Sequence, residues 1–491
     1  MATEHAADHK PESLTMKPLL SPFFCLQFFC LRPASLFLSF VLISGCARYQ
    51  PKPISASTAA QDFEGRTLND ERLGRFLAAN HDTNAWPRKP WDLSALTLAA
   101  FYYHPDLDVV RARWGVAGGA RVTAGERPNP SVSFSPTYDS TTPPPWILGL
   151  SFDIPVETAG KRGYRMTQAR HLSEAARLNL AATAWQVRSR VRRSLLELYA
   201  ARETESALQE QVNAQAKLAE LLAKQVEAGA ATQVELAQAR INLNTTRLSL
   251  QDAQRQAAEG RVQLASAIGV PVTAFDGIEI SFADLDRFPT ELTAREVRRQ
   301  AVLNRNDILG ALAEYAASQS ALQLEIARQY PDLHLGPGYQ LDQTDNKWTL
   351  GATLTLPVLN QNQGTIAQAK ARREEAAARF VSVQAQAAGE IDRAVAGYSA
   401  ATEQAATAKS LLSELEKRRR STQSMFEAGE VDAIAVASAQ TELSAGAMAR
   451  LNSLLKAQQA LAALEDAVQS PLLWPATAQP WETNPRSSLQ P

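Results

Sequence analysis

The chain has 491 residues, and its 50 Lys and Arg residues nearly balance its 51 Asp and Glu residues. A surface that binds nucleic acid usually gives a basic excess, so this balance argues against a nucleic-acid partner. All 3 cysteines lie at or before residue 46, which excludes a disulfide scaffold and a cysteine-rich metal site in the rest of the chain. That remainder is rich in Ala, Gln, Leu, Glu and Arg, a composition typical of long helices.

Residues 1–45 are predicted to be an export signal that starts at Met1 or Met16. A positive start precedes apolar runs, which end in Leu42-Ile43-Ser44-Gly45-Cys46. Small residues directly before a cysteine resemble a bacterial lipobox, so Cys46 is the predicted lipidated first residue of the mature protein. The residue after it is alanine, which resembles the sorting signal for the outer membrane. A transmembrane anchor is the alternative, but the apolar runs are too short or interrupted to span a bilayer.

After the signal, the sequence indicates a twofold internal repeat. Matching residues lie 200 to 202 positions apart, in the same order along both halves: Asp106 and Asp307, Pro130 and Pro331, Trp146 and Trp348, Pro155 and Pro357, Gly229 and Gly429. Such collinear matches are typical of two copies of one unit. We therefore predict an N-terminal periplasmic segment, two repeats and a C-terminal tail, at residues 46–92, 93–290, 291–470 and 471–491.

Each repeat is predicted to begin with a helix, near 94–127 and 293–328, followed by a strand pair. The strands alternate apolar with small or polar residues at 131–139, 146–154, 332–341 and 348–356. Nine or ten residues is the length that a tilted strand needs to cross a bilayer. A soluble hairpin packed on a core alternates in the same way, but the export signal and the doubled motif favour the membrane. The predicted membrane-facing side chains are Trp146, Leu148, Leu150, Trp348, Leu350 and Leu354.

Long helical hairpins are predicted to follow, because each repeat has a stretch of more than 110 residues without proline. One glycine in each stretch supplies the turn, which gives the tips Glu227-Ala228-Gly229 and Glu427-Ala428-Gly429. The helix before each tip is about 100 Å long at the standard rise. The first return leg has a seven-residue seam, typical of knobs-into-holes packing, at Leu236, Leu243, Leu250, Ala257 and Leu264.

Four strands cannot close a barrel, and lipid tolerates no open sheet edge. The chain must therefore oligomerise if the strands span the membrane, and three copies give twelve strands. The predicted fold class is an α+β membrane protein. Its long helical hairpins form an α-barrel, and each chain contributes four strands to a trimeric 12-stranded β-barrel.

The sequence resembles the TolC-type outer-membrane efflux channel family over roughly residues 93–470. The resemblance rests on the duplicated plan, on the strand starts Asn129-Pro130 and Tyr330-Pro331, and on the Glu-Ala-Gly tips. Residues 155–165 also resemble the Gly-Lys-Arg signature of the CzcC-like heavy-metal branch. The family implies a homotrimer in the outer membrane of a Gram-negative bacterium, extending into the periplasm. It also implies docking on a periplasmic adapter and an inner-membrane pump of the RND type. The tips then meet the adapter and close the channel, with Glu430 and Asp432 as gate candidates.

No P-loop, nucleophile elbow or zinc-protease motif is present, and no histidines have metal-ligand spacing. We therefore predict no enzyme activity, no catalytic residues, no cofactor and no metal site. His334 lies alone in a strand and is expected to be a polar residue that faces the lumen. Two other functions stay open, an outer-membrane channel for type I protein secretion and a periplasmic coiled-coil adapter or structural protein. Sequence also leaves the exported substrate open between metal, drug and protein.

Overall fold

The computed structural model describes residues 48–80, 86–286, 288, 299 and 301–472. It divides the chain into a short N-terminal unit, residues 1–59, and a main unit, residues 60–491. The predicted signal peptide with Cys46 lies outside the described residues, as does most of the predicted tail. The helix α2 (Ala56–Glu64) crosses the boundary between the units, and all later elements belong to the main unit.

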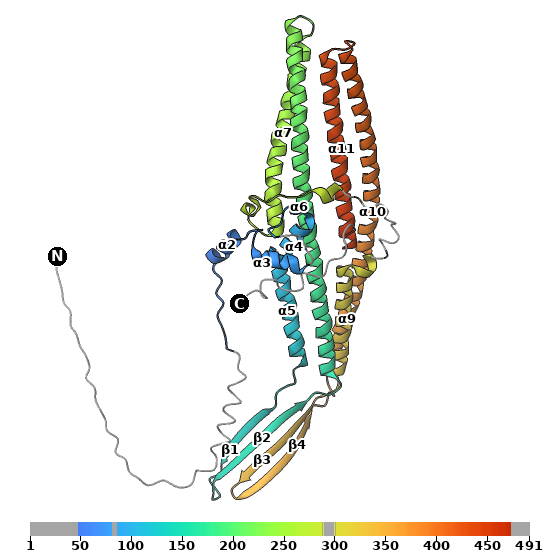
Figure 1. Cartoon of the computed structure of the whole chain (residues 1–491). Helices are drawn as coiled ribbons and strands as arrows, with labels where there is room; N and C mark the ends of the chain where they lie inside the picture. Colours follow the sequence, from blue (N-terminus) through green and yellow to red (C-terminus); the bar gives the residue numbers. More distant parts are fainter. Residues whose placement is uncertain (1–47, 81–85, 287, 289–298, 300, 473–491) are drawn as a thin grey trace, which may run out of the picture. The chain divides into compact units, whose positions relative to one another are not determined.

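The main unit consists of helices and one four-stranded sheet, shown in Figure 1. Its helices are α3 (Glu71–Ala79), α4 (Leu93–Tyr103), α5 (Pro105–Gly125), α6 (Lys161–Glu227), α7 (Gln233–Ile268), α9 (Asn306–Ala327), α10 (Gln363–Glu427) and α11 (Ala433–Val468). The short 3₁₀ helices η1 (Val272–Phe275) and η2 (Ala283–Asp286) follow α7. Among the described residues, no helix is both long and apolar enough to cross a bilayer.

The single helix predicted near 94–127 is in fact two helices, α4 and α5. The break falls at His104 and Pro105, because proline lacks the N–H of a helix interior and clashes with the preceding turn. Pro105 instead takes the first position of α5, where no partner for an N–H is needed. The His104 ring caps the new helix, since its Nδ1 accepts a hydrogen bond from the Asp106 amide at 3.2 Å.

The two longest helices, α6 and α10, have 67 and 65 residues and run from the sheet to the hairpin turns (Figure 1). Each is about 100 Å long at the standard rise per residue. Their return legs, α7 and α11, have 36 residues each and end part-way back. Both long helices start after a residue in the left-handed conformation, Gly160 at φ 72° and Asn362 at φ 64°.

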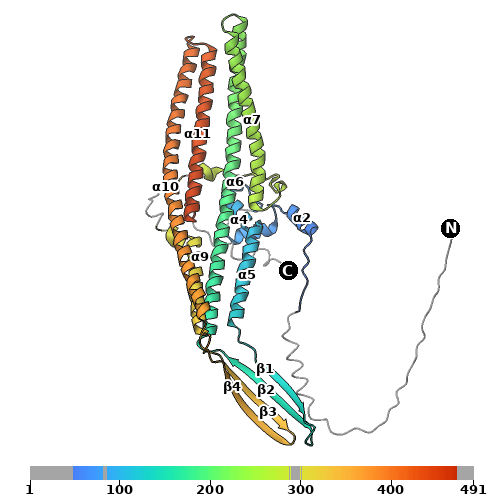
Figure 2. The ribbon, with the colours of Figure 1, turned by 180° about the vertical axis from the view of Figure 1, so that it is seen from behind.

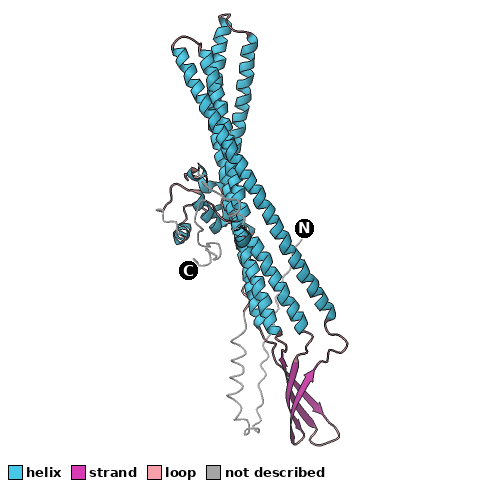
Figure 3. Ribbon diagram, turned by 90° about the vertical axis from the view of Figure 1, so that its right-hand side faces the viewer, coloured by secondary structure: helices cyan, strands magenta, loops and turns pink. Residues whose placement is uncertain are grey.

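The sheet is antiparallel with the strand order β1-β2-β3-β4, and it lies at the end opposite the hairpin turns (Figure 3). The strands are β1 (Ser131–Tyr138), β2 (Trp146–Val156), β3 (Leu333–Asp342) and β4 (Asp345–Leu354). The last strand begins three residues earlier than the predicted 348, because Asp342 pairs with Asp345 across a turn of two residues. Residues 345–347 are all polar, so their side chains gave no sign of a strand in the sequence. Their backbones nevertheless pair with β3.

The register gives the sheet one apolar and one polar face. Phe134 pairs with Leu150, which pairs with Tyr339, and Tyr339 pairs with Trp348. Residues directly opposite each other in neighbouring strands point to the same side of a sheet. Apolar residues therefore extend across all four strands, at Val132, Phe134, Pro136, Tyr138, Trp146, Leu148, Leu150, Phe152, Ile154, Val156, Leu333, Leu335, Pro337, Tyr339, Leu341, Trp348, Leu350, Ala352 and Leu354. The other face carries mainly Ser, Thr, Gly and Asp, with His334.

The largest core cluster lies where the N-terminal helices pack on α6 and on the end of α7. Its fully buried members include Leu68, Leu73, Trp91 and Leu195. Three of these buried residues, Leu68, Leu73 and Trp91, belong to the predicted N-terminal segment, residues 46–92. The short helices therefore form part of the support for α6.

The predicted seven-residue seam lies mostly in the contact between α7 and α6. Leu236, Leu243 and Leu264 are buried, as are the small residues three positions later in each heptad, whereas Leu250 and Ala257 are half-buried. At Gly260, an added Cβ would lie only 3.3 Å from the Cα of Leu198. The close approach of the two backbones therefore favours glycine at this position.

Candidate functional site

The predicted membrane-facing side chains all lie on the apolar face of the sheet. All six are exposed, from Leu150 at 36% to Trp348 at 81%. The remaining apolar residues of that face extend this surface over all four strands. A continuous apolar surface of this size is unusual on a protein that faces only water, and it indicates contact with lipid or protein.

Two aromatic pairs lie at the end of the sheet that is farthest from the helices. Tyr138 and Trp146 have ring centroids 5.2 Å apart, and Tyr339 and Trp348 have centroids 4.8 Å apart. Amphipathic aromatic rings in such a row are typical of the boundary between lipid and water. Both tryptophans were predicted to face the membrane, but their pairing with the tyrosines was not predicted, because it depends on the register of the strands.

On the polar face, His334 is hydrogen-bonded to Asp153. The Nδ1 atom lies 2.9 Å from Oδ1 and 3.2 Å from Oδ2 of that carboxylate, and both side chains are exposed. His334 is thus the polar strand residue that the sequence analysis expected, but its partner was missed. Asp153 lies 181 positions away, and no local pattern signals such a pairing. Nearer the outer end of the sheet, Lys347 forms an ion pair with Asp342.

The junction between β2 and α6 is tied to the start of β3 by a buried lysine. Lys161 Nζ donates to the Asp332 carboxylate at 2.7 Å and to the Tyr330 carbonyl at 2.6 Å. The Thr158 amide also donates to Asp332, at 2.9 Å. Burial would raise the pKa of Asp332, but the hydrogen bonds from Lys161 and Thr158 outweigh it and hold that pKa below its usual value. The Gly-Lys-Arg segment noted in the sequence therefore has a structural role in this protein.

Both predicted tips are turns that close helical hairpins. α6 and α10 end at Glu227 and Glu427, and the glycines two residues later have φ of 72° and 78°. No atom lies within 4 Å of where a Cβ would be at either glycine, so the backbone conformation explains them. Ala228 and Ala428 occupy the equivalent position between these residues in each turn.

The two gate candidates have different surroundings. Asp432 caps α11, since its carboxylate accepts from the Ala435 amide at 2.9 Å. It also accepts from Gln225 Nε2 at 3.2 Å, which links the second tip to the first hairpin. Glu430 is exposed at the turn. Of these two residues, only Asp432 has a contact that ties the tips together.

A buried charge cluster joins α6 to α11, and the sequence analysis missed it. Glu465 is fully buried and accepts hydrogen bonds from Arg188 at 3.1 Å and from Arg192. The next residue, Asp466, accepts from Trp185 Nε1 at 3.1 Å and from the hydroxyl of Ser189 on α6. Burial raises the pKa of Asp466, although these two hydrogen bonds oppose the shift. Burial also lowers the pKa of Arg192, although the attraction of Glu465 opposes that shift.

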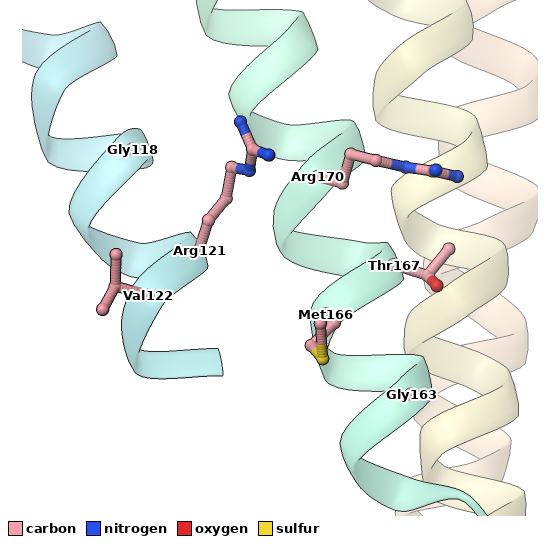
Figure 4. A pocket seen from close by; sticks show the side chains of 7 residues that line it. All are labelled: Gly118, Arg121, Val122, Gly163, Met166, Thr167 and Arg170. Carbon is pink, nitrogen blue, oxygen red and sulfur yellow. The ribbon is translucent and has the colours of Figure 1, made fainter. Parts of the chain in front are cut away.

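A groove of ≈ 630 Å³ lies between α5 and α6, close to the sheet (Figure 4). Two arginines line it, Arg121 and Arg170, together with Gly118, Gly163 and small or apolar side chains. Figure 4 shows the two guanidinium groups pointing in different directions, so they do not converge on one ligand. Within the described ranges, no group of three or more His, Cys, Asp and Glu side chains could hold a metal ion.

Comparison with known families identifies the group to which this chain is related. The family model described as "Outer membrane efflux protein" matches residues 100–270 and 297–468. The chain belongs to the outer membrane efflux protein family. The two matched segments contain both long hairpins and all four strands.

Two curated relatives are each 26% identical to this chain within the segments that align. The cobalt-zinc-cadmium resistance protein CzcC of Cupriavidus metallidurans is 26% identical over 226 residues, which are 46% of this chain and 53% of that protein. The match thus spans about half of CzcC. The pyoverdine export outer membrane protein OpmQ of Pseudomonas aeruginosa is 26% identical over 357 residues, 66% of this chain and 73% of OpmQ.

Solved structures share the fold. The outer membrane protein VceC of Vibrio cholerae superimposes with a TM-score of 0.64 and 22% identity, over 77% of this chain and 96% of VceC. CusC gives a TM-score of 0.62 and 18% identity, over 80% and 95% of the two chains. The helix-rich architecture with a four-stranded sheet is therefore that of outer-membrane channel proteins.

Proposed function

We propose that this chain forms the outer-membrane conduit of a tripartite efflux system. Three copies close a 12-stranded β-barrel in the outer membrane and an α-barrel through the periplasm. The hairpin tips dock on a periplasmic adapter, which connects them to an inner-membrane pump of the RND type. The conduit is passive and exports small solutes.

The observation that carries this proposal is that the main unit is open at both edges. Near the sheet, neighbouring helices contact each other in the order α5, α6, α9, α10, and towards the tips in the order α7, α6, α11, α10 (Figure 2). The sheet likewise has two edges, β1 and β4. A sheet edge in lipid leaves backbone groups without partners, so further copies must pair with β1 and β4.

A second stripe on α7 supports the same closure. Its apolar members lie two positions before the buried seam residues, and two residues turn the chain about 200° round the helix axis. The stripe therefore faces away from α6, and it is exposed at Val234 (78%), Ile241 (58%), Leu248 (67%) and Val262 (54%). A helix with apolar stripes on opposite sides fits the wall of a barrel.

The other edge of the unit is formed by α10, which offers small residues. Its side away from α11 is exposed and carries Ser399, Ala406, Ser410, Ser413 and Ser424, with the charged Glu403 and Lys417 between them. Large residues on one helix facing small residues on another suit closely packed helices. We therefore propose that α7 of one copy packs against α10 of the next.

Further parts of the proposal rest on sequence. The matched halves are proposed to be an internal duplication, which accounts for two hairpins, two strand pairs and two tips. Cys46 is proposed to carry a lipid anchor that adds to the barrel's hold on the membrane. Glu227–Gly229 and Glu427–Gly429 are proposed to meet the adapter, with Asp432 and Glu430 at the gate. Because CzcC is named for cobalt, zinc and cadmium resistance and OpmQ for pyoverdine export, heavy-metal cations and other small solutes are the proposed cargo.

Disulfide cross-linking tests the assembly. The two cysteines are placed at the same distance from the hairpin turns. Leu248 lies 15 residues after the start of α7, and position 412, between Ser410 and Ser413, lies 15 residues before the end of α10. A chain with both Leu248→Cys and Ser410→Cys should form cross-linked ladders ending at three copies under mild oxidation. Ser249→Cys combined with Ser410→Cys is the matched control, because residue 249 lies about 100° further round α7.

The same purified sample, inserted into planar lipid bilayers, should conduct ions. A monomer with full strand content and no conductance would contradict the proposal. A ladder that continues past three copies would reject the trimer but keep the α7–α10 contact.

A further inference from the structure

We propose that His334, oriented by Asp153, is a weak ligand for divalent transition-metal cations passing through the barrel. The proposal rests on the proposed function, because the polar face of the sheet lines a water-filled passage only if the sheet closes into a barrel. It adds a binding residue inside that passage, a class of ligand and a selectivity that sequence motifs did not indicate.

The pair lies on the polar face at the boundary between the two halves of the chain. In the register of β2 and β3, His334 is opposite Pro155, so Asp153 reaches it diagonally from the neighbouring strand. The imidazole is 41% exposed and the carboxylate 51%. Two positions further along the same face of β3 stands Gly336, which has no side chain to cover the ring. The imidazole is thus accessible from the water side.

The hydrogen bond arranges the imidazole as a metal ligand. When Nδ1 carries the proton and donates it to Asp153, the lone pair of Nε2 points away from the carboxylate and is free. A histidine held in this way by a carboxylate is the arrangement found behind zinc-binding histidines, where the carboxylate fixes the tautomer and raises the basicity of the ligand. Neutral imidazole prefers zinc, cobalt and related ions over magnesium.

The four strands carry a small excess of negative charge, and Asp153 is the carboxylate that lies beside His334, whereas the other charged strand residues lie at the far end of the sheet. Besides His334, the four strands contain three carboxylates, Asp153, Asp342 and Asp345, and a single ammonium group, that of Lys347. Lys347 is already paired with Asp342. A passage lined by carboxylates raises the local concentration of cations.

One imidazole with one neighbouring carboxylate gives only weak binding, and weak binding suits a passage. An ion must bind well enough to enter and loosely enough to leave. No group of three or more ligating side chains surrounds the pair in the described part of the chain, so a tightly held metal is not expected. The alternative role for the pair is a cross-strand tie between the two halves of the chain.

Chemical footprinting separates these roles without requiring a working channel. The purified protein in detergent is treated with diethylpyrocarbonate, which modifies free imidazole nitrogen, and each histidine is followed by peptide mass spectrometry. Zn²⁺ should slow the modification of His334 several-fold, whereas Mg²⁺ at the same concentration should not. His171 on α6 is the internal control, since it pairs with no carboxylate in the described part of the chain.

Two variants complete the test. Asp153→Asn should need about 10-fold more Zn²⁺ for the same protection of His334, as for other carboxylates behind metal-bound histidines. His334→Asn keeps a hydrogen-bond donor for Asp153 but removes the metal ligand. Zn²⁺ should therefore reduce the bilayer current of this variant less than that of the parent, whereas Mg²⁺ should affect both currents equally. Equal modification of His334 in Zn²⁺ and Mg²⁺ would overturn the proposal, as would protection unchanged by Asp153→Asn. Failure of the proposed function would appear separately, as the absence of cross-linked copies and of conductance.

Discussion

Helix α6 is held on two sides by contacts of different chemistry. Against α7 it packs through small and apolar residues, so closely that Gly260 lies against the backbone of Leu198. Against α11 it uses buried charges, Arg188 and Arg192 on Glu465. The first contact repeats large and small residues every seven positions, so registers displaced by one heptad differ mainly in where Gly260 lies. The second fixes one register, because a fully buried carboxylate must meet its arginines.

The largest expected effect is at the charged contact. Glu465→Gln removes the counter-charge from two largely buried guanidinium groups and should lower the free energy of unfolding by about 3–5 kcal/mol. The measurement is thermal unfolding of the assembled protein in detergent, followed by circular dichroism. Glu442→Gln is the matched control on the same helix, because Glu442 pairs with Arg418 at 2.8 Å but both side chains are exposed. The control should change stability by less than about 1 kcal/mol.

A triple variant sharpens the comparison. Replacing Arg188, Arg192 and Glu465 together by apolar residues of similar size removes the charges without leaving any of them alone. Stability near that of the parent, with loss of assembly, would assign the cluster to register rather than to stability. If Glu465→Gln and Glu442→Gln behave alike, the buried contact is no more important than an exposed ion pair.

The same contrast explains how much the sequence could predict. The α7 seam follows a seven-residue period, and the strands follow a two-residue period, so both could be read locally. Glu465 lies 277 positions from Arg188, and nothing in its neighbourhood marks it as buried. His334 and Asp153 were hidden in the same way. Pro105 marks a break that can be read from the sequence, because proline does not fit a helix interior, although one helix was predicted across it.

The apolar contact can be broken at its closest point. Gly260→Leu must push α7 away from α6, because the first added carbon would already lie 3.3 Å from Leu198 Cα. We expect a loss of about 1–3 kcal/mol in the free energy of unfolding. Gly115→Ala on α5 is the control, since no atom lies within 4 Å of its added Cβ. A helix gains up to about 1 kcal/mol from that change. Equal effects at the two glycines would show that helix propensity, not close packing, controls this seam.

The two junctions between sheet and helices extend the comparison to smaller energies. Lys161 of the first junction meets the carboxylate of Asp332, whereas Asn362 of the second donates to the carbonyl and carboxylate of Glu325 at 2.8 and 2.9 Å. Only the first involves a buried cation. Asp332→Asn should therefore cost about 1.5–3 kcal/mol, the usual contribution of a hydrogen bond to a charged group. Glu325→Gln should cost less, because the neutral amide of Asn362 requires no charge opposite it, and Arg328, which also pairs with Glu325, is half exposed to water.

Thermal unfolding of the two single variants, measured side by side, tests this difference. A loss at Glu325→Gln as large as that at Asp332→Asn would mean that the charge of Lys161 is immaterial. In that case the backbone carbonyl of Tyr330, 2.6 Å from Lys161 Nζ, would satisfy the lysine by itself.

The smallest expected effect is in the pH dependence of stability, and it has opposite signs at two aspartates. The pKa of Asp332 is held below 3.8, so the unfolded state binds more protons, and its contribution to stability is lost as the pH falls through the folded-state pKa. Burial raises the pKa of Asp466 above 3.8, so the folded state binds more protons just above that pH, and acidification favours folding at this site. Asp332→Asn should therefore make the protein less sensitive to acid, and Asp466→Asn more sensitive.

Unfolding midpoints of both variants and the parent, measured from neutral pH downwards, give the two slopes. Slopes that change in the same direction would mean that the hydrogen bonds from Ser189 and Trp185 outweigh burial at Asp466, so that both sites stabilise a carboxylate.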